Sequence, residues 1–411
     1  MMGLEGLTDV EVILLVLAAF YVSEAFGWFR GGSAWFVSVA GGACRIIRSA
    51  LLTGNDLAGP IFLELLPSGR SFLARSWPVS ISPTGLYSFS AASLSPGGRQ
   101  DQPARYVPFV EVDTIEARGD EVEINNKTFV SAASHSHARF IAENLRRIAH
   151  VSPETRGSEI EAFLDVMTDE KAVKDRVAEI DSKSSTLKTT SFLLFVLVFV
   201  LAPFGYYEFR LHPSSTRLLV AFLLSFFFLW IFNVFSFARV ARSIEPDDRL
   251  HRRKQVLTMA LSPVAAMRAW SHLPRHALLN FHPLAIAVAV CNEDMARNLA
   301  GDLLRDALHP LPPSCPDDTP AHLETEAWFR ERLAEAFFRL AQRSGYDPER
   351  MLTAPERESA SRSYCPRCHD QYEVTSGTCT SCEGLGLISF DGEVSTASST
   401  SAPGSLDPGQ V

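Results

Sequence analysis

Four cysteines near the C-terminal end of the chain are spaced so that they could hold one metal ion. Cys365 and Cys368 form one C-x2-C pair, and Cys379 and Cys382 form a second pair after an interval of ten residues. A C-x2-C pair can direct both sulfur atoms from one tight turn to the same ion, and two such pairs complete the tetrahedral sulfur site that Zn2+ favours. The spacing therefore predicts a zinc site with these four thiolates as ligands.

The expected ligand set also indicates the role of the metal and its compartment. Four cysteine ligands leave no open coordination position for a substrate, so a structural zinc ion is expected, with redox activity of the C-x2-C pairs as the alternative. The thiolates must stay reduced, which places this part of the chain in a reducing compartment. His369 could replace one thiolate, although its position directly after Cys368 favours a supporting role beside the ligands.

The segment from Tyr364 to Gly384 resembles a zinc ribbon, in which two knuckles on β-hairpins share one structural zinc ion. We place this module at residues 361–388. Many ribbons bind nucleic acid, but between Arg362 and Gly386 two arginines stand against three acidic residues before the thiolates are counted. Because nucleic-acid binding depends on excess positive charge, the module is expected to bind a protein partner instead.

The composition of the whole chain excludes further classes of protein. Its 411 residues carry 38 basic and 47 acidic side chains, which gives a net charge of −9. A protein that coats nucleic acid would need an excess of Lys and Arg. The other cysteines, Cys44, Cys291 and Cys315, lie far apart in the sequence, which argues against a secreted disulfide framework.

Three apolar stretches predict an α-helical membrane protein with three transmembrane helices. Residues 189–207 and 218–238 carry no charge, and each would be about 30 Å long as a helix, enough to cross the hydrocarbon core. Only ten residues separate them, so they are expected to form a transmembrane helical hairpin over residues 189–238. A third stretch predicts an N-terminal transmembrane anchor at residues 8–30, in which Glu24 either has a function inside the membrane or lies at its interface.

Basic residues beside these stretches predict their orientation. The connection between the second and third stretches contains only Arg210 and Arg217 as basic residues, whereas the outer flanks carry many Lys and Arg. By the positive-inside rule, the chain is expected to be a multi-pass protein of a bacterial-type inner membrane, with its N-terminus outside and most of its residues in the cytosol. This orientation agrees with the reducing environment that the thiolates require.

Residues 31–150 predict a cytosolic β-rich domain closed by an amphipathic helix. Alternating apolar residues surround turn signals such as Ser82-Pro83-Thr84-Gly85 and Asn125-Asn126, which indicates an antiparallel meander. In the helix that follows, Phe140 and Leu145 belong to one apolar face.

Within this domain, residues 105–149 resemble the last strands and the helix of pleckstrin-homology-like domains. The resemblance implies a binding module, with a simple structural domain as the alternative. Lipid recognition is not carried over, because the strands contain no compact cluster of Lys and Arg, and the small-molecule ligand stays undefined.

The rest of the cytosolic chain reads mainly as helices. Ser262-Pro263 and His282-Pro283 are typical of helix starts, and an aromatic stripe that includes Trp328 and Phe337 predicts an amphipathic helix ending at Gly345. The remaining expected regions are a helical stalk at residues 151–188, a cytosolic helical region at 239–308, a Pro-rich linker with an amphipathic helix at 309–360, and a disordered tail at 389–411.

No combination of residues predicts an enzyme, since the sequence contains no H-E-x-x-H, G-x-S-x-G, P-loop or G-x-G-x-x-G motif. The sequence therefore predicts a membrane-anchored cytosolic interaction or assembly platform, in which the zinc ribbon binds a protein. One alternative is a non-catalytic or site-sharing subunit of a membrane enzyme or transporter complex that uses Glu24. The other is a membrane-tethered regulator that binds nucleic acid, which the acidic ribbon disfavours.

Overall fold

The structure is a computed structural model. It describes residues 34–38, 44–48, 79–88, 105–119, 121–132, 135–197, 201, 216–246, 249–267, 269–270, 273, 277–290, 293–309, 320–382 and 384–391. Several predicted features lie outside these residues. They are the N-terminal anchor at residues 8–30 with Glu24, most of the connection that follows residue 197, the proline-rich part of the linker at 310–319, and residues 392–411 of the tail.

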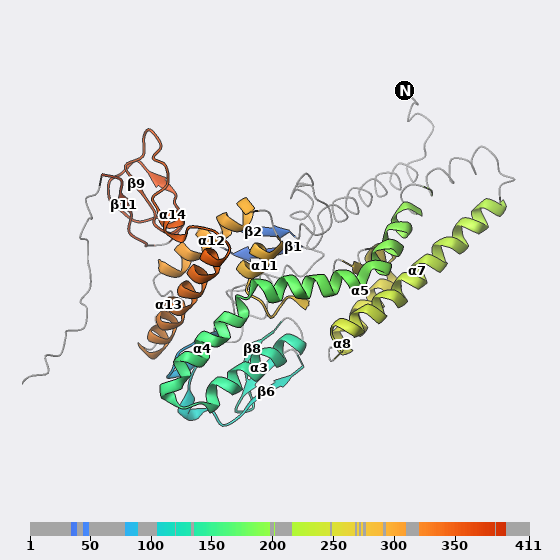
Figure 1. The fold of residues 1–411 in the computed structure, drawn as a ribbon, viewed down its shortest axis with the longest axis horizontal. Coiled ribbons are helices and arrows are strands. Elements are labelled where there is room, and N and C mark those ends of the chain that lie inside the picture. The colour runs from blue at the N-terminus through green and yellow to red at the C-terminus, as the bar shows by residue number, and fades with distance from the viewer. Residues whose placement is uncertain are drawn as a thin grey trace, which may run out of the picture.

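The β-rich part contains two antiparallel three-stranded sheets (Figure 1). The first has the order β3-β4-β5, with β3 at Val79–Ile81, β4 at Gly85–Ser88 and β5 at Arg105–Pro108. The second has the order β6-β7-β8, with β6 at Ile115–Arg118, β7 at Glu121–Ile124 and β8 at Lys127–Ser131. A short 3-10 helix, Phe109–Glu111, joins the sheets, and β1 (Ala34–Ser38) pairs with β2 (Cys44–Arg48).

The predicted turns form where their residue types indicated. The Ser82 hydroxyl accepts hydrogen bonds from the backbone N–H groups of Thr84 and Gly85, both at 3.3 Å, and so fixes the β3–β4 turn. At the β7–β8 turn, Asn125 and Asn126 have φ angles of 52° and 58°. Asparagine tolerates this left-handed conformation, which a two-residue hairpin turn requires.

Ten helices are described in the rest of the chain. They are α3 (His135–His150), α4 (Pro153–Met167), α5 (Glu170–Val196), α7 (Thr216–Ile244), α8 (Arg249–Leu261), α9 (Pro263–Met267), α11 (Pro283–Val290), α12 (Glu293–Leu308), α13 (Pro320–Arg343) and α14 (Pro348–Leu352). The helix starts at Pro263 and Pro283 are as predicted. The aromatic stripe lies on α13, which ends two residues before Gly345, and this glycine has a φ of 79°.

The predicted stalk is divided into α4 and α5. Thr168 ends α4 by donating its hydroxyl to the Leu164 carbonyl at 2.8 Å. Asp169 then begins α5, because its carboxylate accepts a hydrogen bond from the backbone N–H of Ala172 at 3.0 Å. The two caps allow the chain to turn between the β-rich part and the long helix α5.

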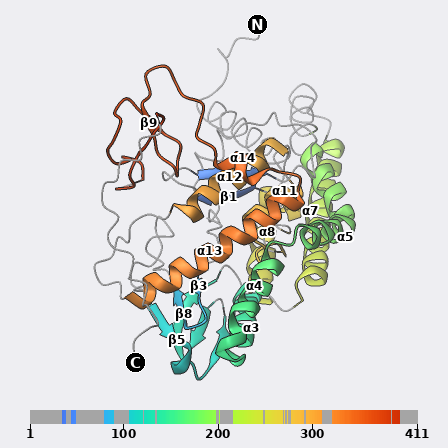
Figure 2. The same ribbon diagram turned by 60° about the vertical axis from the view of Figure 1, so that its left-hand side comes forward.

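One apolar core joins elements that are far apart in the sequence. It contains side chains of both sheets, of α3 and α4, and of α11, α12 and α13, among them Ile81, Phe163, Leu284 and Phe337. Figure 2 shows α13 running from the β-sheets toward α12 and α14. The described sheets and helices from β3 to α4 therefore fold as one unit with α11, α12 and α13.

The predicted fold class with three transmembrane helices is wrong. Within the described residues, only one helical segment, Val220–Ile244 of α7, is long and apolar enough to cross a membrane. The described first part of the stretch, residues 189–196, is the end of α5, a helix whose preceding turns are charged. Thr190 and Ser191 in this part are buried. Apolar sequence alone does not distinguish a helix that faces lipid from one that packs against neighbours. The other described elements are small sheets and helices around a buried core.

Helix α7 differs from the other described helices because eight of its large apolar side chains are exposed. Phe228 and Phe235, for example, are 69% and 71% exposed. In the C-terminal half of α7, Asn233 is fully buried. Its side chain accepts a hydrogen bond from Thr190 of α5 at 2.8 Å and donates one to the Ala266 carbonyl of α9 at 2.6 Å. This polar contact satisfies the buried amide and fixes how α5, α7 and α9 meet.

Candidate metal centre

The four cysteines belong to a small module at one end of the molecule, beside α14 (Figure 1). Its three short strands are β9 (Ser363–Tyr364), β10 (Gln371–Tyr372) and β11 (Ile388–Ser389), in the order β10-β9-β11. Cys365 and Cys368 lie in the loop between β9 and β10, and the other two cysteines lie between β10 and β11. The sheet therefore holds the two C-x2-C loops side by side.

The four sulfur atoms converge on one point. All four lie within 4.8 Å of one another, and the sulfurs of Cys368 and Cys379 are 3.6 Å apart. A tetrahedral ion with metal–sulfur bonds of about 2.3 Å would separate its ligands by about 3.8 Å. The cysteines are free thiols, three of them buried. The predicted clustering is confirmed, and the arrangement can hold a metal ion.

The backbone closes both loops in the same way. The N–H of Cys365 donates to the Asp370 carbonyl at 2.9 Å, and the N–H of Cys379 donates to the Leu385 carbonyl at 2.8 Å. His369 and Gly384 follow the two C-x2-C pairs with φ angles of 64° and 89°. This left-handed conformation suits glycine and is uncommon for other residues, which explains why Gly384 is favourable there.

Among the described residues, the group that could hold a metal ion comprises the four cysteines and does not include His369. Its ring instead meets the Tyr364 ring edge-on, with the ring centroids 6.0 Å apart. The interpretation of His369 as a fourth ligand in place of a thiolate is therefore not supported. Its place in the fold is that of a turn residue beside the site.

Burial and hydrogen bonding shift the pKa values of three of the cysteines. Burial raises the pKa of Cys368, and burial raises the pKa of Cys382 to about 12. For Cys379, burial acts in the same direction, but hydrogen bonds from Tyr372 and other neighbours outweigh it and lower the pKa. Without a positive charge among them, most of these thiols would stay protonated at neutral pH. A divalent cation would stabilise all four as thiolates.

Two hydrogen bonds support the sulfur of Cys379. The Tyr372 hydroxyl donates to it at 3.2 Å, and the backbone N–H of Cys382 donates at the same distance. Donors of this kind orient a metal ligand and stabilise its negative charge. Tyr372 reaches the sulfur from β10, so the sheet positions the ligand as well as the loops.

We expect Tyr372→Phe to weaken binding of Zn2+ about tenfold, because it removes a hydrogen bond to one ligand while leaving all four sulfurs in place. Competition with a chromophoric chelator would measure the change in affinity. Tyr364→Phe is the matched control, since the Tyr364 ring packs against Phe390 and its hydroxyl has no hydrogen bond within the described residues. Equal affinities of the two variants would contradict this role of Tyr372.

The module that contains the four cysteines contacts the helical core through arginines. Arg367, which lies between Cys365 and Cys368, is buried and pairs with Asp306 of α12. Arg305 of α12 donates to the Arg367 carbonyl at 3.3 Å and to the Met351 carbonyl of α14 at 3.0 Å. Thus the first C-x2-C loop is held directly against α12, and Arg305 links it indirectly to α14.

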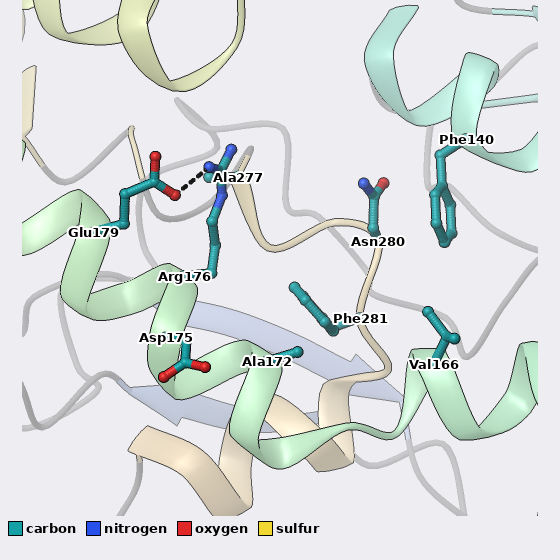
Figure 3. A pocket seen from close by; sticks show the side chains of 9 residues that line it. All are labelled: Phe140, Val166, Ala172, Asp175, Arg176, Glu179, Ala277, Asn280 and Phe281. Carbon is teal, nitrogen blue, oxygen red and sulfur yellow. Dashed lines mark hydrogen bonds and ion pairs between the residues drawn. The ribbon is translucent and has the colours of Figure 1, made fainter.

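A separate hollow of about 530 Å³ lies between α3, α5 and residues 277–281 (Figure 3). Its polar side chains include Asp175, and Arg176 is already paired with Glu179 at 2.6 Å and donates to the Ile244 carbonyl at 2.9 Å. The described residues that line the hollow include no cysteine, histidine or serine. This hollow therefore offers neither a nucleophile nor a set of metal ligands. The expectation that the chain is not an enzyme stays a prediction.

No family model, curated protein or solved structure matches the chain. The candidate site is therefore defined by its own geometry. Sequence reasoning located the four ligands but missed Tyr372, Arg305 and Arg367. Of these three residues, only Arg367 could have been recognised from the sequence. It lies between Cys365 and Cys368, so its position already places it in the C-x2-C loop.

Proposed function

We propose that the chain is a membrane-anchored cytosolic interaction platform, in which a zinc-loaded ribbon carries the protein-binding surface. The observation that supports this most strongly is the closed set of four sulfurs within 4.8 Å of one another. Such a set suits a structural Zn2+ and leaves no coordination position for a substrate. The metal would thus stabilise the module, and the chemistry of the platform would be binding.

The proposed anchor is α7, together with the exposed apolar residues at the end of α5. Phe192 and Leu193 of α5 are exposed, as are eight large apolar residues of α7 between Val220 and Phe235. In water these side chains would form an unusually large apolar surface, whereas a bilayer would cover it. The described elements before and after this region share one core, so we propose that the end of α5 carries the chain into the bilayer and α7 carries it back to the same face. The cytosolic face suits the reduced thiols.

The proposed binding surface is the exposed loop at residues 373–378 of the ribbon. All six residues of the loop are exposed, and Val374 presents an apolar side chain that is 54% exposed. The loop contains Glu373 and no basic residue, which suits a protein partner better than the phosphates of nucleic acid. It precedes Cys379 directly, so metal binding would fix its C-terminal end.

Photo-crosslinking in cells tests this proposal. With a photoreactive residue in place of Val374 in the full chain, we expect a discrete protein adduct that protease removes and nuclease does not. The adduct should be lost when Cys379→Ser is added. The matched control has the photoreactive residue in place of Lys127, which is exposed at the first position of β8. An adduct that persists in the Cys379→Ser background, a nuclease-sensitive adduct, or no adduct at Val374 would contradict the proposal.

A further inference from the structure

Exposed basic side chains gather where α7 ends and α8 begins. Six basic residues stand against three acidic ones between residues 239 and 254, although the chain as a whole has a net charge of −9. Five of the basic residues are exposed, and none of the five forms an ion pair with another described residue. We refer to these five as the basic collar: Arg239, Arg242, Arg249, Arg253 and Lys254.

Two hydrogen bonds fix how α8 lies along α7, and therefore where the collar residues of the two helices lie relative to each other. Arg252 of α8 donates to the Glu245 carbonyl at 2.9 Å, which holds the start of α8 beside the end of α7. The Trp230 indole N–H donates to the Met259 carbonyl near the end of α8, also at 2.9 Å. Helix α8 therefore runs back along α7, as Figure 1 shows. Its basic N-terminal half lies near Arg242, and its apolar C-terminal half lies near Trp230.

On the two helices, the changes from apolar to basic surface lie within about one helical turn of each other. On α7, the uncharged stretch ends at Ala238, and the first collar residue follows directly. On α8, Lys254 is five residues before Met259, which corresponds to about 7.5 Å along the helix. The same step along α7 from Trp230 reaches Phe235. Leu257 and Leu261, which is 75% exposed, thus continue the apolar surface of α7, and the collar forms its border.

We infer that the basic collar binds the headgroups of anionic phospholipids. This inference rests on the proposed insertion of α7. With α7 in the bilayer, the uncharged stretch of about 30 Å fills the hydrocarbon core, and the collar lies at the level of the lipid phosphates. Each basic residue near an anionic leaflet strengthens binding to that leaflet by about fivefold. The positive charge of the collar would offset the repulsion between the negatively charged chain and the anionic lipid headgroups.

The apolar part of α8 distinguishes a lipid surface from nucleic acid as the partner. Leu257 and Leu261 are exposed on the helix that carries three of the collar residues. A lipid surface offers acyl chains to these leucines and phosphates to the collar, in the same order along α8. Nucleic acid would leave the leucines in water. The order of side chains on α8 therefore favours the membrane.

Native mass spectrometry of the detergent-solubilised full chain tests the inference. With equal amounts of phosphatidylglycerol and phosphatidylcholine, we expect the wild-type chain to retain the anionic lipid with a preference of about tenfold or more. Arg249→Gln, Arg253→Gln and Lys254→Gln combined should remove this preference. The matched control combines Lys127→Gln, Lys171→Gln and Arg343→Gln, which remove the same charge at exposed positions on other elements, and it should bind like the wild type.

Three results would overturn the inference. They are equal retention of the two lipids by the wild type, an unchanged preference in the collar variant, and displacement of phosphatidylglycerol by inorganic phosphate or short duplex DNA at matched concentration. Flotation with phosphatidylcholine vesicles after an alkaline carbonate wash separates this failure from that of the proposed anchor. A chain that floats but shows no lipid preference overturns the collar alone, whereas a chain that does not float overturns the insertion of α7.

Discussion

Replacing Cys379 by serine is expected to weaken the affinity of the chain for Zn2+ by more than about a hundredfold. Loss of a supporting hydrogen bond alone costs about tenfold to a hundredfold, and this variant removes a ligand together with the two hydrogen bonds that its sulfur accepts. Competition with a chelator of known affinity would measure the loss. Ser381→Ala is the matched control, because Ser381 is exposed within the same C-x2-C loop and is not a ligand.

The same variant should release the metal-binding module from the helices. Its small sheet consists of two-residue strands, which cannot supply a core of their own, so metal binding and folding of the module are expected to be coupled. Hydrogen exchange should rise across residues 363–389 and at Arg305, which donates to the Arg367 carbonyl in the intact structure. A Cys379→Ser chain that keeps wild-type zinc affinity and exchange protection would contradict this account of the site.

Arg156→Ala is expected to lower the free energy of unfolding by about 3 kcal/mol. Arg156 is only 8% exposed and donates to the carbonyls of Ile148 at 3.3 Å, Val151 at 3.2 Å and Pro83 at 2.5 Å. Its guanidinium also lies 4.1 Å from the centroid of the Phe109 ring. The variant would remove these interactions and leave buried carbonyls without donors, where the first sheet meets the α3–α4 junction.

Denaturant unfolding of the detergent-solubilised chain would measure this effect. Arg147→Ala is the matched control, because Arg147 pairs with Glu159 between the same two helices but is half exposed. Exposed pairs of this kind contribute less than about 1 kcal/mol. Arg156→Lys should also destabilise the chain, since a single ammonium cannot reach three carbonyls. Equal losses in Arg156→Ala and Arg147→Ala would show that the buried guanidinium does not hold the β-rich part to the helices.

Features that depend on neighbouring residues could be predicted from the sequence. The β3–β4 turn depends on Ser82 and Gly85, and the helices at Pro263 and Pro283 depend on the proline at their first position. The metal cluster belongs to the same class, because each C-x2-C pair places its two sulfurs from a single turn. In each of these cases, the information lies within a few residues.

Features that depend on distant contacts could not be predicted. The apolar stretch from residue 189 suggested a membrane span, but its first residues pack inside the molecule, with Thr190 bonded to Asn233, 43 residues away. The predicted ribbon follows the proline-rich linker in the sequence, and its Arg367 pairs with Asp306 on α12, which precedes that linker. Nothing in either local sequence indicates these partners. The core shared by the β-sheets and α13 could not be predicted for the same reason, because it combines residues that are far apart in the sequence.

The metal content of the purified full chain tests the zinc site most directly. Elemental analysis should find about one zinc ion per chain, and mass spectrometry after alkylation of the native protein should find Cys365, Cys368, Cys379 and Cys382 protected until the zinc is chelated. A folded chain that contains less than about a tenth of that zinc, and whose four thiols react without chelator, would contradict the account of this module as a structural zinc ribbon.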